Sequence, residues 1–161
     1  MDPGVVVLFV LIAIFLGQWL LERTSRTHRL IRAYGEFFHV TPRTAWEDGV
    51  SHTGLDPAKG AECCAGRCEP SVFLCTGEKL AESIRMTGTR HNHEDELAIL
   101  RIDARTLAKK RLIGDCTHQR GIPDLETSLT VTGNLACLDT IRVDELSLAD
   151  IVTNEEKSNL I

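Results

Sequence analysis

The sequence predicts an α+β domain preceded by a single transmembrane helix. An 18-residue segment without charged side chains, residues 4–21, lies at the N-terminus. The rest of the chain, from Tyr34 onward, is long enough for one domain with one hydrophobic core. Within that domain the helical patterns come early and most strand patterns come late, which favours an α+β fold over a doubly wound parallel sheet.

The N-terminal apolar segment has the length of a membrane span. A helix over residues 4–21 would be about 27 Å long, close to the hydrocarbon thickness of a bilayer. Trp19 lies near its C-terminal end, where an interfacial aromatic side chain belongs. A cleaved signal peptide fits less well, because no basic side chain precedes the segment and no small-residue cleavage site follows it. A buried core helix would rarely be apolar on every side over this length.

Basic side chains follow the apolar segment at once, at Arg23, Arg26, Arg29 and Arg32. The positive-inside rule then places the N-terminus outside and the domain in the cytoplasm, as a single-pass membrane protein. We therefore expect an anchor with a basic juxtamembrane segment over residues 1–33, a domain over residues 34–152 and a flexible polar tail over residues 153–161. The bilayer, contacted through residues 4–21, is the expected partner of the anchor.

The first half of the domain carries the clearest local signals. Residues 36–40 are short and rich in aromatic and β-branched side chains, which predicts a buried strand. Thr41 and Pro42 predict a helix start, with Thr41 as N-cap, and Gly54 is placed to end that helix. The next expected elements are a loop over residues 56–70, a strand over 71–75, a helix capped by Thr76, a loop over 88–96 and a strand over 97–102.

The second half is expected to be mainly extended. Residues 106–114 are ambiguous between helix and strand. Residues 128–132 alternate between polar and apolar, which predicts a strand, followed by a turn at Gly133 and Asn134. Residues 136–143 are a further extended candidate, and Leu146, Leu148 and Ile151 predict one last packed element.

Charge and cysteine content exclude some classes of function. A net charge of −5 argues against broad nucleic-acid binding, which depends on Lys and Arg. Cysteines in a cytoplasmic domain stay reduced. The spacing of Cys63, Cys64, Cys68 and Cys75 lacks the usual CxxC knuckle, so free thiols are favoured over a zinc site or disulfides. We therefore expect no metal site.

Two blocks of the domain resemble the ADP-ribosyltransferase-like superfamily. The first is Phe38-His39-Val40-Thr41, followed by the predicted helix and by Gly54-Leu55-Asp56-Pro57. The second is the strand Val72-Phe73-Leu74, the helix from Glu78, and the strand Ala98-Ile99-Leu100-Arg101-Ile102-Asp103. Together the blocks extend the resemblance over residues 36–150.

The resemblance implies a split two-sheet α+β fold whose cleft holds NAD⁺ as substrate. It implies that His39 hydrogen-bonds a ribose hydroxyl, which suits an imidazole with one donor and one acceptor. Thr41 would add a polar contact, and Phe73 is a candidate for stacking on the nicotinamide ring. A carboxylate would stabilise the oxocarbenium-like transition state as nicotinamide leaves. Glu126, before the predicted strand at 128, is the first choice, with Asp139 and Glu145 as alternatives.

The chain departs from the family pattern at the helix after the second strand, where the family usually has a tyrosine and this chain has no aromatic residue around Ser83. The leading hypothesis is transfer of ADP-ribose to a macromolecule or to water at the membrane, by His39 and Glu126. The alternative is an inactive relative that binds a ligand or a partner there. A third hypothesis, an RNA 2′-phosphotransferase, would use arginines such as Arg85, Arg90 and Arg101.

Overall fold

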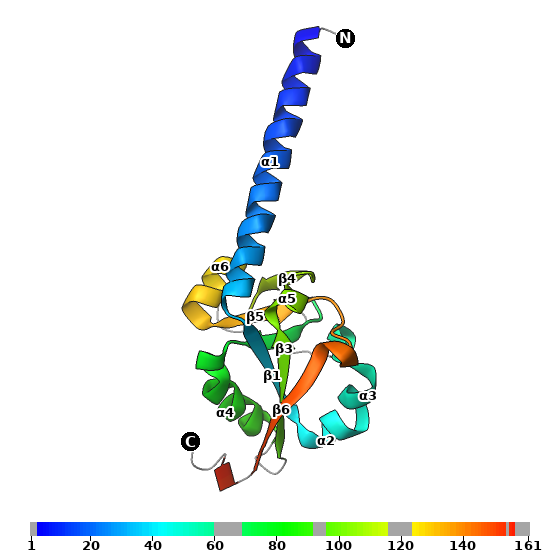
Figure 1. Cartoon of the computed structure of the whole chain (residues 1–161), viewed down its shortest axis with the longest axis vertical. Coiled ribbons are helices and arrows are strands. Elements are labelled where there is room, and N and C mark those ends of the chain that lie inside the picture. The colour runs from blue at the N-terminus through cyan, green and yellow to red at the C-terminus, as the bar shows by residue number, and fades with distance from the viewer. Residues whose placement is uncertain (1–2, 60–68, 92–95, 116–123, 154, 157–161) are drawn as a thin grey trace.

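The structure is a computed structural model that describes residues 3–59, 69–91, 96–115, 124–153 and 155–156, with the side chains of residues 3–4 and 22–25 left out. It has an α+β architecture, in which a long N-terminal helix leads into an antiparallel sheet with helices on either side (Figure 1). The predicted α+β class is therefore confirmed. Of the predicted tail, only Thr153 and residues 155–156 are among the described residues.

The N-terminal helix α1 (Pro3–Ala33) joins an exposed apolar segment to the core of the domain. It is the one described helix that is long and apolar enough to cross a membrane, and its apolar side chains from Val5 to Leu21 are largely exposed. At its other end Ile31 is fully buried, and Leu30 and Tyr34 pack against the same core. The helix thus enters the domain without a break between residues 21 and 31.

The sheet consists of two three-stranded halves. Its strands are β1 (Glu36–Pro42), β2 (Val72–Cys75), β3 (Leu97–Asp103), β4 (Leu112–Gly114), β5 (Asn134–Cys137) and β6 (Leu146–Val152), in the order β4-β5-β2-β1-β3-β6. Neighbouring strands pair along their length within each half. Between the halves, β1 and β2 pair at one position, Phe38 with Cys75. The described strands therefore form one continuous sheet where the resemblance implies two.

The predicted strands of the first half are confirmed, but the first helix begins later than expected. Thr41 and Pro42 still pair with β3, so Thr41 is a buried strand residue and not an N-cap. The helical segment that follows consists of α2 (Arg43–Ala45), the wider π-helical turn η1 (Trp46–Val50) and α3 (Ser51–Thr53). Gly54 ends it, as predicted, with a φ of +79° and a ψ of −174°, a combination that glycine tolerates.

The second helix region runs beside the first strands. Thr76 precedes the short η3 (Gly77–Lys79) without a side-chain capping bond, and α4 (Leu80–Arg90) follows. The helix continues through the buried Gly88, so the predicted loop from residue 88 begins three residues too early. The remaining short helices are η2 (Pro57–Lys59), α5 (Ala104–Leu107), α6 (Leu125–Thr127), η4 (Ser128–Thr132) and η5 (Val143–Glu145).

The strand predicted at residues 128–132 is wrong, because this segment is the π-helical η4, which continues α6. Asp124 caps the run by accepting hydrogen bonds from the backbone and hydroxyl of Thr127. Thr130 and Thr132 then donate their hydroxyls to carbonyls four residues earlier. These local bonds stabilise a helix that the polar–apolar alternation does not reveal. The extended candidate 136–143 is likewise shorter than predicted, since β5 ends at Cys137.

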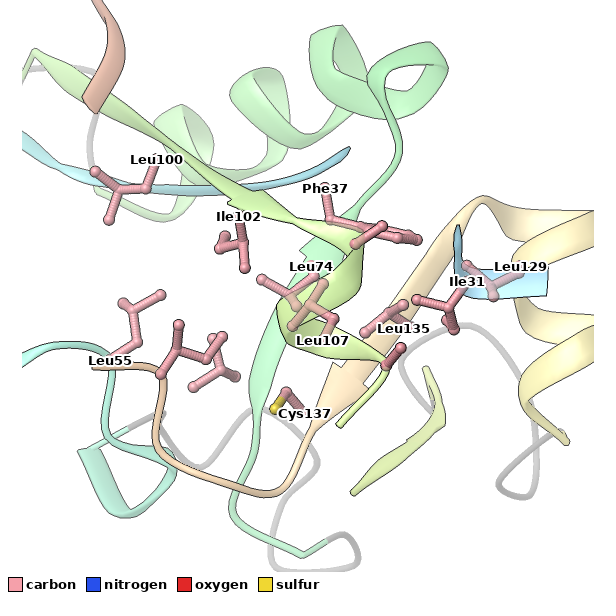
Figure 2. Packing of buried hydrophobic residues seen from close by; sticks show 14 of the residues in the cluster. Ile31, Phe37, Leu55, Leu74, Leu100, Ile102, Leu107, Leu129, Leu135 and Cys137 are labelled. Carbon is pink, nitrogen blue, oxygen red and sulfur yellow. The ribbon is translucent and has the colours of Figure 1, made fainter. Parts of the chain in front are cut away.

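Two hydrophobic clusters hold the domain together, one on each face of the sheet. The larger one joins Ile31 of α1 to the sheet residues Phe37, Leu100 and Leu135 (Figure 2). The smaller one lies against α4, where Ile84 packs among residues of the opposite face; its members are Phe38, Val40, Cys75, Ile84, Leu97, Ile99 and Val152. Aliphatic side chains provide most of this buried surface.

Candidate functional site

A cavity of about 490 Å³ lies where the two halves of the sheet separate. We call it the cleft. The ends of β1 and β2 form its centre, α4 lines one side, and the segment from α2 to η2 lines the other. Its polar and charged lining residues are His39, Thr41, Thr53, Asp56, Lys59, Ser71, Lys79, Glu82, Ser83, Thr87, Arg90, His91, Asp115 and Asn134. A cavity of this size is typical of sites for small organic ligands.

The cleft exists because β1 and β2 separate from each other beyond the pair Phe38 and Cys75, while each strand stays paired with its other neighbour. His39 pairs with Leu100 of β3, while Phe73 pairs with Ala136 of β5. A side-chain bond crosses the gap instead of a backbone ladder, since the Nδ1 atom of His39 lies 2.8 Å from the carbonyl oxygen of Phe73. His39 therefore both lines the cleft and links the two halves of the sheet.

The surroundings of His39 fix its protonation state. A carbonyl oxygen can only accept, so Nδ1 must carry the proton that is donated to Phe73. Burial lowers the pKa of His39 below its ordinary value of 6.5, and the hydrogen bond to Phe73 opposes this only in part. The ring is thus neutral at pH 7, and its second nitrogen, Nε2, is an acceptor. A neutral acceptor suits a hydroxyl group of a ligand.

The structure brings the three residues predicted to bind the cofactor, His39, Thr41 and Phe73, to the same cleft. Thr41 is buried on the strand two residues after His39. Phe73 is half-buried and lines the cleft, and it belongs to neither hydrophobic cluster. An aromatic ring is therefore available to a ligand on β2.

The structure does not bring Glu126 to the cleft. Glu126 lies on α6, is exposed, and forms an ion pair of 2.5 Å with Arg26 of α1. Its expected place at the start of a strand is lost because residues 125–132 are helical. The two alternative carboxylates also lie elsewhere: Asp139 bonds to Arg111, and Glu145 bonds to Lys110 at 2.7 Å beside a separate, smaller cavity.

Among the residues that line the cleft, Glu82 and Asp115 carry carboxylates that the sequence analysis did not name. Glu82 on α4 lines it and lies 3.2 Å from the Lys79 ammonium. Asp115 is buried after β4, where its backbone N–H donates to the Ser128 hydroxyl. Asn134 begins β5 and also lines the cleft. The turn predicted at Gly133 was the one sequence signal that pointed to Asn134.

Two cysteines are among the described residues, and both are buried free thiols. Cys75 lines the cleft, and burial raises its pKa to about 11, so it is not a thiolate nucleophile at neutral pH. Burial also raises the pKa of Cys137. No group of His, Cys, Asp and Glu side chains is placed to hold a metal within the described part of the chain. Cys63, Cys64, Cys68, Cys116 and His93 lie outside it.

Comparison with known proteins adds no relative: no protein-family model, no curated protein and no solved structure matches this chain. The chemistry of the cleft must therefore be argued from its own residues. Its centre and its two sides together offer a neutral imidazole acceptor, an aromatic ring, hydroxyl groups, and both anionic and cationic side chains. This combination can recognise a ligand that carries hydroxyls, a flat ring and negative charge.

Proposed function

We propose that this chain is a membrane-anchored protein with an ADP-ribosyltransferase-like fold, and that its cleft binds NAD⁺. The observation that carries the proposal is the position of His39. It lies at the junction of the two half-sheets with Nδ1 bonded to Phe73, which leaves Nε2 as the acceptor for a ligand hydroxyl. The sheet is continuous, but β1 and β2 pair at one position only, which supports a cleft at the place where the resemblance implies a split.

In this proposal three of the lining residues hold the dinucleotide. His39 accepts a hydrogen bond from a ribose hydroxyl, and Thr41 adds a polar contact on the same strand. Phe73 provides the aromatic surface for the nicotinamide ring, in the absence of an aromatic residue around Ser83 on α4. We infer that NAD⁺ binding is the function that this arrangement supports best.

Transfer of ADP-ribose to a macromolecule or to water is the second candidate, and Glu82 favours it. A carboxylate near the ribose would stabilise the positive charge that develops as the glycosidic bond to nicotinamide breaks. Glu126 does not line the cleft and pairs with Arg26, whereas Glu82 lines the cleft directly. An RNA phosphotransferase has less support, because Arg85 and Arg101 do not line the cleft.

The test separates binding from turnover. The full chain in detergent micelles would be titrated with NAD⁺ by calorimetry, and nicotinamide release would be followed by chromatography. Saturable binding without release supports the binding function. Release that is lost in Glu82→Gln supports the transferase. If NAD⁺ does not bind at millimolar concentration to the folded chain, the proposal is overturned.

Glu126→Gln is expected to leave NAD⁺ binding unchanged. The substitution removes an exposed ion pair with Arg26, so the free energy of unfolding should change by less than about 1 kcal/mol. Calorimetric titration and urea unfolding of the variant measure both quantities, with Glu82→Gln as the matched variant inside the cleft. A large loss of NAD⁺ affinity in Glu126→Gln would contradict this expectation and show that Glu126 takes part in binding.

We propose that α1 anchors the chain with the domain in the cytoplasm. Protease added to intact spheroplasts is then expected to leave the domain uncut, while the chain stays in the membrane fraction after carbonate extraction. Permeabilised spheroplasts serve as the control, since the domain should become accessible there. The basic residues Arg26, Arg29 and Arg32 support this orientation. Digestion of the domain in sealed spheroplasts would contradict it.

A further inference from the structure

One wall of the cleft is a continuous face of α4. The lining residues Glu82, Ser83, Met86, Thr87 and Arg90 are spaced three and four apart, so they share one side of the helix. From Lys79 to Arg90 the helix rises about 16 Å. A ligand that follows this wall is therefore elongated, with one end near Lys79 and the other near Arg90.

The two ends of this wall differ in charge balance. At the first end the Lys79 ammonium lies 3.2 Å from the Glu82 carboxylate, so its charge is compensated within the protein. At the other end the guanidinium of Arg90 has no carboxylate within ion-pair distance among the described side chains. Arg43 of α2 shows the contrast, since it pairs with both Glu47 and Glu96.

We propose that Arg90 binds a phosphate group of the ligand, so that the cleft selects diphosphate-bearing dinucleotides over nucleosides. This inference rests on the proposed NAD⁺ binding, and it identifies Arg90 as the residue that would bind the pyrophosphate group. A guanidinium presents paired N–H donors that match two phosphate oxygens. The carbonyls at the C-terminal end of α4 oppose an anion there, but this dipole effect is weaker than a charge-assisted bidentate contact.

The chain offers a matched control on the same helix. Arg85 is exposed on α4 but does not line the cleft, so it has the same charge and helical context without access to the ligand. Arg90→Gln is expected to weaken NAD⁺ binding by about 10- to 100-fold, the loss of a charge-assisted hydrogen-bonded contact. Arg85→Gln should change the affinity less than about twofold. Arg90→Lys should recover part of the loss.

The experiment uses the full chain in detergent micelles, with NAD⁺ and nicotinamide riboside as probes in calorimetric titrations. The inference expects Arg90→Gln to weaken NAD⁺ and to leave nicotinamide riboside, which has no phosphate, unchanged. If wild type binds NAD⁺ and Arg90→Gln binds it equally well, the inference is overturned while NAD⁺ binding stands. An equal loss for both probes also overturns it, because the effect would then be structural.

A further probe separates the inference from the proposed function. If wild type does not bind NAD⁺ but binds inorganic pyrophosphate, and Arg90→Gln loses that binding, the phosphate contact is supported and NAD⁺ is overturned as the ligand. If neither NAD⁺ nor pyrophosphate binds the folded chain, both are overturned. Circular dichroism of each variant confirms that the chains compared are folded.

Discussion

Gly54→Ala is expected to destabilise the domain by about 3–4 kcal/mol. A Cβ atom at this position would lie 2.3 Å from the backbone carbonyl oxygen of Ile141, and φ of +79° is unfavourable for alanine. Relief of the clash would break the paired backbone bonds between Leu55 and Ile141, of 2.8 and 3.0 Å. These bonds hold the wall of the cleft after α3 against the chain that follows β5.

Urea unfolding of the full chain in mild detergent, followed by circular dichroism, measures this loss. Gly49→Ala is the matched control, because Gly49 lies in the helical turn η1 and a Cβ there meets no atom within 4 Å. That substitution should leave the stability unchanged or raise it by up to about 1 kcal/mol. Equal unfolding midpoints for the two variants would show that Gly54 is not held in this conformation.

His39→Ala is expected to reduce NAD⁺ affinity by at least about tenfold and to destabilise the domain by about 1–3 kcal/mol. The affinity falls because the Nε2 acceptor is lost. The stability falls because the Phe73 carbonyl loses its donor across the gap between the half-sheets. Calorimetry and urea unfolding measure the two effects separately. Unchanged affinity in a folded His39→Ala chain would remove His39 from the site.

The same residue predicts a dependence of stability on pH. The pKa of His39 is lowered in the folded state, so below about pH 6.5 the unfolded chain takes up a proton that the folded chain resists. The contribution of the neutral ring to the free energy of unfolding is therefore fully present above the pKa of the unfolded state. It is lost as the pH falls through 6.5 toward the pKa of the folded state. His39→Gln keeps a donor for Phe73 but does not titrate. The difference in the free energy of unfolding between wild type and this variant, measured by urea unfolding, should therefore shrink from pH 7.5 to pH 5.5.

Local sequence signals predicted those parts of the fold that local physics decides. The aromatic and β-branched composition of residues 36–40 and the aliphatic run at 97–102 predicted β1 and β3. The end of the first helix at Gly54 followed from the tolerance of glycine for positive φ. At residues 128–132 the alternation misled, because the capping bonds of Asp124 and the back-bonds of Thr130 and Thr132 favour a helix.

The sequence predicted the strand residues of the candidate site but not its helix residues. His39, Thr41 and Phe73 lie on strands whose neighbours in sequence fix them, and the structure places all three at the cleft. Glu82 was not named, and Arg90 was named only together with Arg85 and Arg101, since which side of α4 faces the cleft depends on how Ile84 and Gly88 pack on the sheet. Glu126 was chosen for its place before a strand, and that strand does not form.

The unbroken passage of α1 into the core also limits what the domain can reach. Only nine residues, about 15 Å of helix, separate Leu21 from the buried Ile31, and Arg26 and Tyr34 bond to α6 and η4 near the point where the helix enters the domain. A flexible linker would let the domain sample a broad volume, whereas the anchoring proposed above would hold it at a set height and tilt over the bilayer. That anchoring would favour macromolecular targets that are themselves confined to the same membrane.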